Sequence, residues 1–230
     1  PGVGLPPIPA DGGIDTLDGG AGNDQAYLMY TGRTTQVVLD NSNSAAVNGV
    51  SVGGVVEGTF TSVESLVVFA GTAGDSLTGG SGSDIFFGMD GADTLKGGNG
   101  DDVLEGGTGA DRLEGGAGND SAAYILATAG VNVDLRIQGA AQATGRGSDT
   151  LISIENVVGG EVADVLIGNA ALNRLEGGAG ADTYRYFSLG DLNRDVIVKA
   201  AGAGDRIDLS AIDADLGAAG DQAFAMVSAF

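Results

Sequence analysis

The chain has 230 residues with 31 acidic and 10 basic side chains, which give it a net charge of -21 at pH 7. This charge disfavours nucleic acid and anionic membranes as partners and favours cations. Histidine and cysteine are both absent, so a Ser-His-Asp triad, a histidine-bound catalytic zinc and a disulfide framework are excluded.

The first ten residues, PGVGLPPIPA, are rich in proline and glycine and predict a linker over 1–10. They contain neither an initiator methionine nor a signal peptide, so we expect the chain to be a processed piece of a longer protein. No apolar run reaches the roughly 18 residues of a transmembrane helix, so we expect no insertion into a membrane.

Two nine-residue units follow the linker, ADGGIDTLD and GGAGNDQAY, and they carry Asp15 and Asp24 at the same position. The pattern then lapses over about 28–69, where apolar β-formers predict an insertion that contains strands. Gly49 to Gly53 match the G-x-S-x-G pattern of serine hydrolases. Since the chain has no histidine to act as a base, a strand and turn rich in Gly and Val explain this match better.

Six nine-residue units then follow one another without a break from Ala70 to Ala123. In each unit a glycine-rich half ends in aspartate, and an apolar residue stands two positions later. The glycine-rich half predicts a tight turn, and the apolar part predicts a very short strand. A flexible linker is the alternative, but a linker has no reason to keep apolar residues in phase with both Gly and Asp. The six aspartates are Asp75, Asp84, Asp93, Asp102, Asp111 and Asp120.

One turn and one short strand make only half a coil, so two units should complete one coil of a parallel β-roll. Asp75, Asp93 and Asp111 then line one edge, and the other three aspartates line the opposite edge. Coils stack about 4.8 Å apart, so the carboxylates repel one another unless they are neutralised. Calcium fits this need because it takes about six to eight oxygen ligands from carboxylates and carbonyls, whereas magnesium tends to keep its waters.

A second insertion and a worn repeat block are predicted over 124–185. VNVDL alternates as a strand within the insertion, and the block after it keeps Asp164 and Asp182, which share an edge because they are 18 residues apart. Asn173 stands where a further aspartate is expected. Its side chain offers an oxygen but no charge, so a site on its edge should be weak or empty.

Glu64 in SVES and Glu155 in SIEN close the two insertions at corresponding places, and we expect both to be structural. From 186 to 230 the repeat gives way to DVIV and DRIDL, whose alternating apolar residues predict strands. These strands should close the end of the roll, because an open end invites association from edge to edge.

The units GGNGDDVLE, GGTGADRLE and GGAGND resemble the repeats-in-toxin (RTX) nonapeptide, a calcium-binding β-roll repeat. This resemblance implies that each ion lies between two turns of one edge, which are two units apart. The implied pairs are Asp75 with Asp93, Asp84 with Asp102, Asp93 with Asp111, and Asp102 with Asp120. The implied carbonyl ligands lie near Gly80, Gly82, Gly91, Gly98, Gly100, Gly107, Gly109, Gly116 and Gly118. With Asp15, Asp24, Asp164 and Asp182 as further candidates, the sequence predicts several calcium ions, about four or more.

The stretch DRIDLSAID is similar to the C-terminal segment of serralysin-type secreted proteases. This similarity implies a bacterial, extracellular protein and the type I secretion machinery as a partner of the parent protein. It brings no catalytic zinc, since the chain has no histidine. The chain stops at Phe230, earlier than expected for that family, so we expect its C-terminal secretion signal to be incomplete.

The sequence therefore predicts an all-β chain: a parallel β-roll with a first repeat block over 11–123, the second insertion and block, and a C-terminal β cap. We expect a calcium-binding structural module that folds on calcium outside the cell and is not itself an enzyme. One alternative is a non-catalytic part of a secreted protease, lipase or polysaccharide-modifying enzyme that assists substrate binding. Another is an adhesin or surface-layer module that self-associates through calcium.

Overall fold

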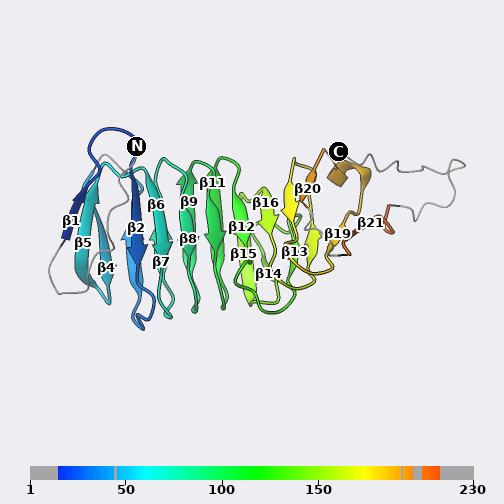
Figure 1. Ribbon diagram of the computed structural model, residues 1–230, viewed down its shortest axis with the longest axis horizontal. Helices are drawn as coiled ribbons and strands as arrows, with labels where there is room; N and C mark the ends of the chain where they lie inside the picture. The colour runs from blue at the N-terminus through cyan, green and yellow to red at the C-terminus, as the bar shows by residue number, and fades with distance from the viewer. Residues whose placement is uncertain (1–14, 44–45, 193, 199–203, 213–230) are drawn as a thin grey trace, which may run out of the picture.

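The elongated β-roll of Figure 1 is a computed structural model that describes residues 15–43, 46–192, 194–198 and 204–212. The predicted linker and the end of the chain, with its expected secretion signal, lie outside the described residues. From blue to orange, the described strands follow one another along the long axis of the roll (Figure 1). The predicted fold class is confirmed, since the described elements are strands apart from one 3-10 helix, η1 (Leu189–Leu192).

Three sheets form the walls of the roll. The first sheet has the order β1 (Asp15–Asp18), β5 (Val55–Thr61), β4 (Asn48–Val52), β3 (Val37–Asp40), β7 (Ser76–Thr78), β9 (Thr94–Asn99), β11 (Arg112–Ala117), β15 (Ser148–Ile152) and β14 (Ala141–Ala143). The second has the order β2 (Gln25–Met29), β6 (Ser65–Phe69), β8 (Ile85–Phe87), β10 (Val103–Glu105), β12 (Ser121–Ala123), β16 (Asn156–Val158), β18 (Arg174–Glu176) and β20 (Val196–Val198). The third consists of β13 (Asn132–Asp134), β17 (Val165–Ile167), β19 (Thr183–Arg185) and β21 (Arg206–Asp208).

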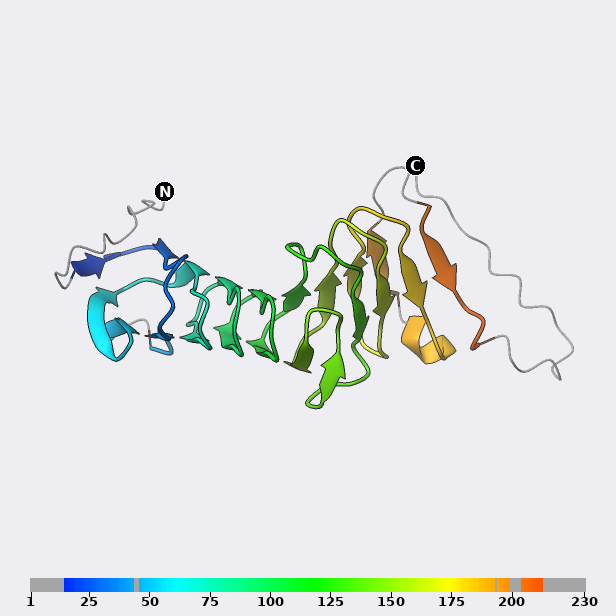
Figure 2. The ribbon, with the colours of Figure 1, turned by 90° about the horizontal axis from the view of Figure 1, so that it is seen from below.

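The repeat strands pair in parallel with the strand 18 residues further along, as the half-coil interpretation predicts. Leu77, Leu95 and Leu113 are register partners in the first sheet, while Phe86 and Leu104 are partners in the second. All five side chains are fully buried in one core cluster. One inward side chain per short strand is thus enough to form a core, because the inward side chains of the neighbouring coils pack against it on both sides. In the view of Figure 2 the successive coils lie side by side along the long axis.

The two insertions continue the roll instead of leaving it. In the first, β3, β4 and β5 form an antiparallel meander whose strand β3 pairs in parallel with β7 of the next coil. In the second, VNVDL forms β13, which starts the third sheet, and β15 extends the first sheet beyond β11. The sequence predicted strands in these stretches but not that they take the place of whole coils.

The predicted C-terminal strands are β20 and β21, which pair in parallel with β18 and β19. They extend the second and third sheets by one strand each, with Ile197 packed against the core. Two of the repeat strands, β9 and β11, are six residues long and include glycines that the sequence assigned to turns. No helix in the described ranges is long and apolar enough to cross a membrane.

Candidate calcium sites

The aspartates of the repeats form hydrogen-bonded ladders along the edges of the roll. Each of these aspartates except Asp15 stands just before a strand. Where a repeat turn precedes it by one coil, as for Asp93 and Asp102, its Oδ1 accepts the backbone N–H of the aspartate in that turn. The predicted partners therefore do lie next to each other. The N···Oδ1 distances are 2.7 Å for Asp75 to Asp93, 2.7 Å for Asp84 to Asp102, 2.9 Å for Asp93 to Asp111, 2.9 Å for Asp102 to Asp120 and 2.9 Å for Asp164 to Asp182.

Acidic residues that the sequence did not assign to the ladders complete them. Asp149 accepts the N–H of Asp111 at 3.2 Å, and Glu155 accepts that of Asp120 at 2.9 Å. A signal for Asp149 existed: DTLI keeps the aspartate and the inward leucine of the repeat although the glycines are lost. The same signal marks Asp195 in DVIV and Asp205 in DRID, which accept the N–H groups of Asn173 and Asp182.

Glu64 has the role for Asp24 that Glu155 has for Asp120. Its Oε2 accepts the N–H of Asp24 at 3.0 Å, and this supports the structural role expected for both glutamates. Asp15 is the first residue of β1 and pairs there with Gly58.

The second carboxylate oxygen, Oδ2, divides the ladder aspartates into two classes. In Asp75, Asp84 and Asp164 it accepts the N–H of the residue four positions earlier, at 2.8, 3.0 and 2.8 Å. We call these the capped aspartates. In the other class, the free aspartates, Oδ2 is buried and has no hydrogen-bond partner among the described residues. We keep this name for the aspartates of the nine-residue units, which are Asp24, Asp93, Asp102, Asp111, Asp120 and Asp182; outside these units, Oδ2 of Asp195 and of Asp205 is likewise buried without a partner in the described part of the chain.

The backbone four residues before each aspartate explains the division. Before every free aspartate this residue has a positive φ, for example +113° at Gly98 before Asp102. Before the capped aspartates it is Gly71, Gly80 or Gly160, none of which has a positive φ. A positive φ turns the amide away from the carboxylate, so the N–H that caps Asp84 has no counterpart at Asp102. Met89, which precedes Asp93 by four residues, also has a positive φ, of 79°, although it is not glycine.

From Asp93 onward, each free Oδ2 lies against the first glycine of its unit, where any other residue would carry its Cβ. A Cβ built on Gly88 would contact Asp93 Oδ2 and would lie 2.6 Å from the carbonyl oxygen of Gly106. Cβ atoms on Gly97, Gly106, Gly115 and Gly177 would likewise contact the Oδ2 atoms of Asp102, Asp111, Asp120 and Asp182. The first glycine of these units therefore lets the carboxylate lie against the backbone, and Gly79 and Gly159 do the same for the capped Asp84 and Asp164.

Turn carbonyls of one coil also face the turn of the next. A Cβ on Gly98 would lie 2.5 Å from the oxygen of Gly80, and one on Gly100 would lie 2.7 Å from that of Gly82. The carbonyls of Gly91, Gly98 and Gly100 face Gly109, Gly116 and Gly118 in the same way, and that of Gly109 faces Gly147. Gly107, Gly116 and Gly118, whose carbonyls are predicted ligands, all have positive φ. In these contacts their Cα positions face the carbonyl oxygens of the preceding coil.

Burial makes the carboxylates costly to ionise without a counter-charge. Asp84, Asp93, Asp102 and Asp111 are at most 2% exposed. Loss of hydration is the largest cause that raises the pKa of Asp84 and Asp93 to about 7, of Asp102 to about 8 and of Asp111 to about 6. Ladder neighbours add to the rise, as Asp84 and Asp120 do at Asp102, while the ladder N–H groups oppose it.

This arrangement suits a hard cation. A buried, unpaired carboxylate oxygen beside backbone carbonyls is the donor set that calcium takes. No three acidic side chains gather around one point in the described part of the chain, so carbonyls would have to supply most ligands of such an ion. The residues present therefore fit calcium, held by one carboxylate and the turns around it.

Asn173 shows what the capped position requires. Its Oδ1 accepts the N–H of Asn169 at 2.7 Å, four residues earlier, as Oδ2 of Asp84 does from Gly80. Its amide donates to the carbonyl of Glu155 at 2.8 Å. An uncharged side chain is thus sufficient where a backbone N–H caps the oxygen.

Comparison with known families agrees with this geometry. The model of the RTX calcium-binding nonapeptide repeat, in four copies, matches residues 10–28, 67–95 and 87–122. The model of the peptidase M10 serralysin C terminal region matches residues 148–228. No curated protein gives a significant match. The fold and the ladders define a calcium-binding β-roll. Residues within 10–122 thus carry RTX-type repeats, and residues 148–228 are similar to the C-terminal region of serralysin-type peptidases; both matched parts are non-catalytic ones.

Proposed function

We propose that this chain is a calcium-dependent structural module of a type I secreted protein, and that it completes its folding on calcium outside the cell. The observation that carries the proposal is the set of buried Oδ2 atoms at Asp93, Asp102, Asp111 and Asp120 without a hydrogen-bond donor among the described residues. Bound calcium would supply the positive charge that their burial requires.

The two classes of aspartate suggest which turns hold ions. For every free aspartate from Asp93 onward, the preceding coil contains a glycine turn that also ends in aspartate. For the capped Asp75, Asp84 and Asp164, the preceding coil belongs to an insertion. An ion needs carbonyls from the turn of the preceding coil, and an insertion supplies none of the repeat glycines. We therefore assign ions to Asp93, Asp102, Asp111, Asp120 and Asp182.

The same reasoning gives the capped aspartates a different task. Both oxygens of Asp75 accept backbone N–H groups, from Val37 at 2.6 Å and from Gly71 at 2.8 Å. Asp84 and Asp164 are engaged in the same way. We propose that these residues join each repeat block to the insertion before it and that ions contact the carbonyls of their turns.

Calcium would couple folding to the compartment. Extracellular calcium modules bind at about 10⁻⁴ to 10⁻³ M, so at about 1 mM calcium each site adds about 0.4 to 1.4 kcal/mol. Several sites together are comparable with the whole stability of a domain, about 5 to 15 kcal/mol. At the low calcium level inside a cell this stabilisation is lost and the carboxylates repel, which would keep the chain unfolded for export.

Circular dichroism with a calcium titration tests this proposal. In excess EGTA the chain should lose most of its strand signal, and calcium should restore it cooperatively, while magnesium at the same concentration should not. Equal strand content and equal thermal stability in EGTA and in calcium would overturn the proposal.

A further inference from the structure

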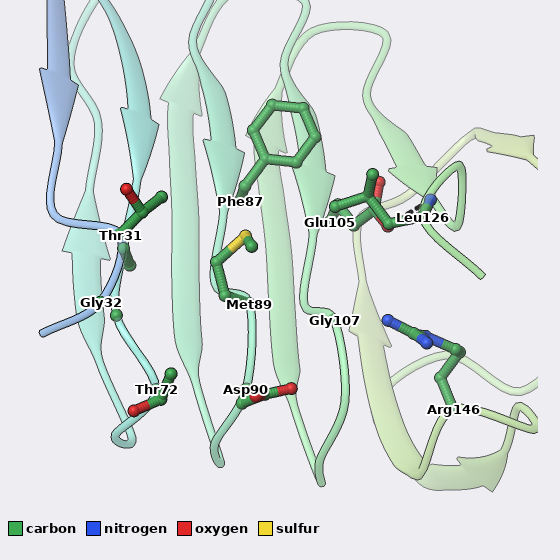
Figure 3. A pocket seen from close by; sticks show the side chains of 12 residues that line it. Thr31, Gly32, Thr72, Phe87, Met89, Asp90, Glu105, Gly107, Leu126 and Arg146 are labelled. Carbon is green, nitrogen blue, oxygen red and sulfur yellow. Dashed lines mark hydrogen bonds between the residues drawn. The ribbon is translucent and has the colours of Figure 1, made fainter. Parts of the chain in front are cut away.

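A groove beside the second sheet borders the ladder turns, since Gly71, Met89 and Gly107 line it, but none of the ladder aspartates is among its lining residues. It lies between the insertion that carries Thr31 and Gly32 and the later insertion that carries Leu126 and Arg146, and it encloses about 190 Å³. Figure 3 shows Phe87, Met89 and Glu105 between these two sides.

The sheet around this groove is apolar on its outer face. Strand alternation turns Tyr27 and Met29 of β2 outward, and they are 44% and 55% exposed. Met29 is the register partner of Phe69, which in turn pairs with Phe87. The rings of Phe69 and Phe87 stack with their centroids 4.4 Å apart. The corresponding outward residues of the first sheet are polar, such as Thr94 and Arg112 beside Ser76.

Glu105 ends the apolar row and places a carboxylate in the groove. It is 1% exposed, its Oε1 accepts the N–H of Leu126 at 2.9 Å, and its Oε2 is buried without a hydrogen-bond partner in the described residues. A purely structural role for Glu105 as a cap of the Leu126 turn accounts for Oε1. It leaves Oε2 without an explanation, since a buried unpaired carboxylate oxygen is costly.

Arg146 supplies a donor on the same side of the groove. Its Nε is buried and has no acceptor within the described ranges, and its side chain points toward Gly107 (Figure 3). Its charge is close enough to lower the pKa of Glu105, which burial raises more strongly. Asp90 is a second acidic residue in the lining, so the groove, like the whole chain at -21, favours a positively charged occupant.

We propose that this groove docks an extended, apolar segment of a partner protein through a lysine side chain. The ammonium of that lysine donates to Glu105 Oε2, and its methylene stem lies along Phe87 and Met89. A peptide carbonyl beside the lysine accepts from Arg146 Nε–H. The apolar neighbours of the lysine cover the outward row of Met29 and Phe69.

Fluorescence anisotropy with a labelled peptide tests the proposal on the full chain in calcium. The probe is Gly-Val-Ser-Lys-Ser-Phe-Gly, in which the valine, lysine and phenylalanine share one face when the peptide is extended. Two companions replace its lysine with norleucine or glutamate. The lysine peptide should bind at least about tenfold more tightly than either companion, because it alone satisfies the buried carboxylate.

Variants then locate the contact. Glu105→Gln should remove the preference for lysine over norleucine. Glu176→Gln is the matched control, since Glu176 lies in the same outward row of the second sheet, as the partner of Val158, and should keep the preference. No binding of the lysine peptide at millimolar concentration, equal binding of the norleucine peptide, or preference for the glutamate peptide would each overturn the proposal. These three comparisons use the unaltered chain, so they test the proposal even if the Glu105→Gln variant does not fold.

Discussion

The two classes of aspartate predict opposite behaviour for two neighbouring rungs of one ladder. Asp84 and Asp102 lie on the same edge, are 0% and 1% exposed, and are joined by a hydrogen bond of 2.7 Å. Asp84→Asn should leave the number of bound calcium ions unchanged, because Oδ2 of Asp84 already accepts the N–H of Gly80. Asp102→Asn should lose one ion, because it removes the charge at a free oxygen.

The size of the effect follows from calcium linkage. At about 1 mM calcium a single site adds about 0.4 to 1.4 kcal/mol to the free energy of unfolding. For a chain of this length that corresponds to a fall in Tm of about 1 to 6 °C for Asp102→Asn. In EGTA the strand signal that remains should be at least as large for this variant as for the unaltered chain, since a buried charge that repels Asp84 and Asp120 has been removed.

Thermal unfolding of both variants in calcium, circular dichroism in EGTA and the calcium content after equilibrium dialysis measure these quantities. Asn173 indicates that the asparagine of Asp84→Asn can be accommodated, since it occupies a capped position in this chain. Loss of one ion from both variants, or a fall in Tm for Asp102→Asn without the loss of an ion, would refute the division into capped and free aspartates.

Three further predictions concern pH, the first glycine of a unit and the worn block. The folded pKa values of Asp93 and Asp102, about 7 and 8, lie above the ordinary value of 3.8, so the folded metal-free chain binds more protons than the unfolded chain, and its free energy of unfolding should fall from about pH 4 to pH 8. Circular dichroism in EGTA should show the strand signal falling as the pH rises through this range, and calcium should abolish the fall. Gly88→Ala should displace one ion because its Cβ fills the space beside Asp93, whereas Gly49→Ala, which would lie 3.6 Å from its nearest neighbour, should retain all ions in dialysis. Asn173→Asp should add no ion, because the position stays capped by Asn169; a gain of one calcium ion in the same assay would contradict this.

The sequence predicts the repeat geometry well because few residues determine it. The nine-residue period and the apolar residue two places after each aspartate are sufficient to predict parallel coils, and Leu77, Leu95 and Leu113 do stack in register. The order of aspartates along each edge follows from the same period.

The division of the aspartates could not be predicted from residue types. Gly80 has an ordinary φ and caps Asp84, whereas Met89 has a φ of 79° and leaves Asp93 uncapped. Since glycine adopts a positive φ more readily than methionine, residue type alone would predict a positive φ at Gly80 and an ordinary φ at Met89. What decides is the preceding coil, which is an insertion for Asp84 and a glycine turn for Asp93. The groove at Glu105 likewise depends on two insertions that meet across the second sheet, and no local pattern marks it.

Anomalous scattering from crystals grown in calcium tests the central claim most directly. The account predicts one peak beside each of the Oδ2 atoms of Asp93, Asp102, Asp111 and Asp120, at about 2.3 to 2.6 Å, with N–H groups still capping Asp75 and Asp84. Ordered coils without calcium at these four carboxylates would contradict it.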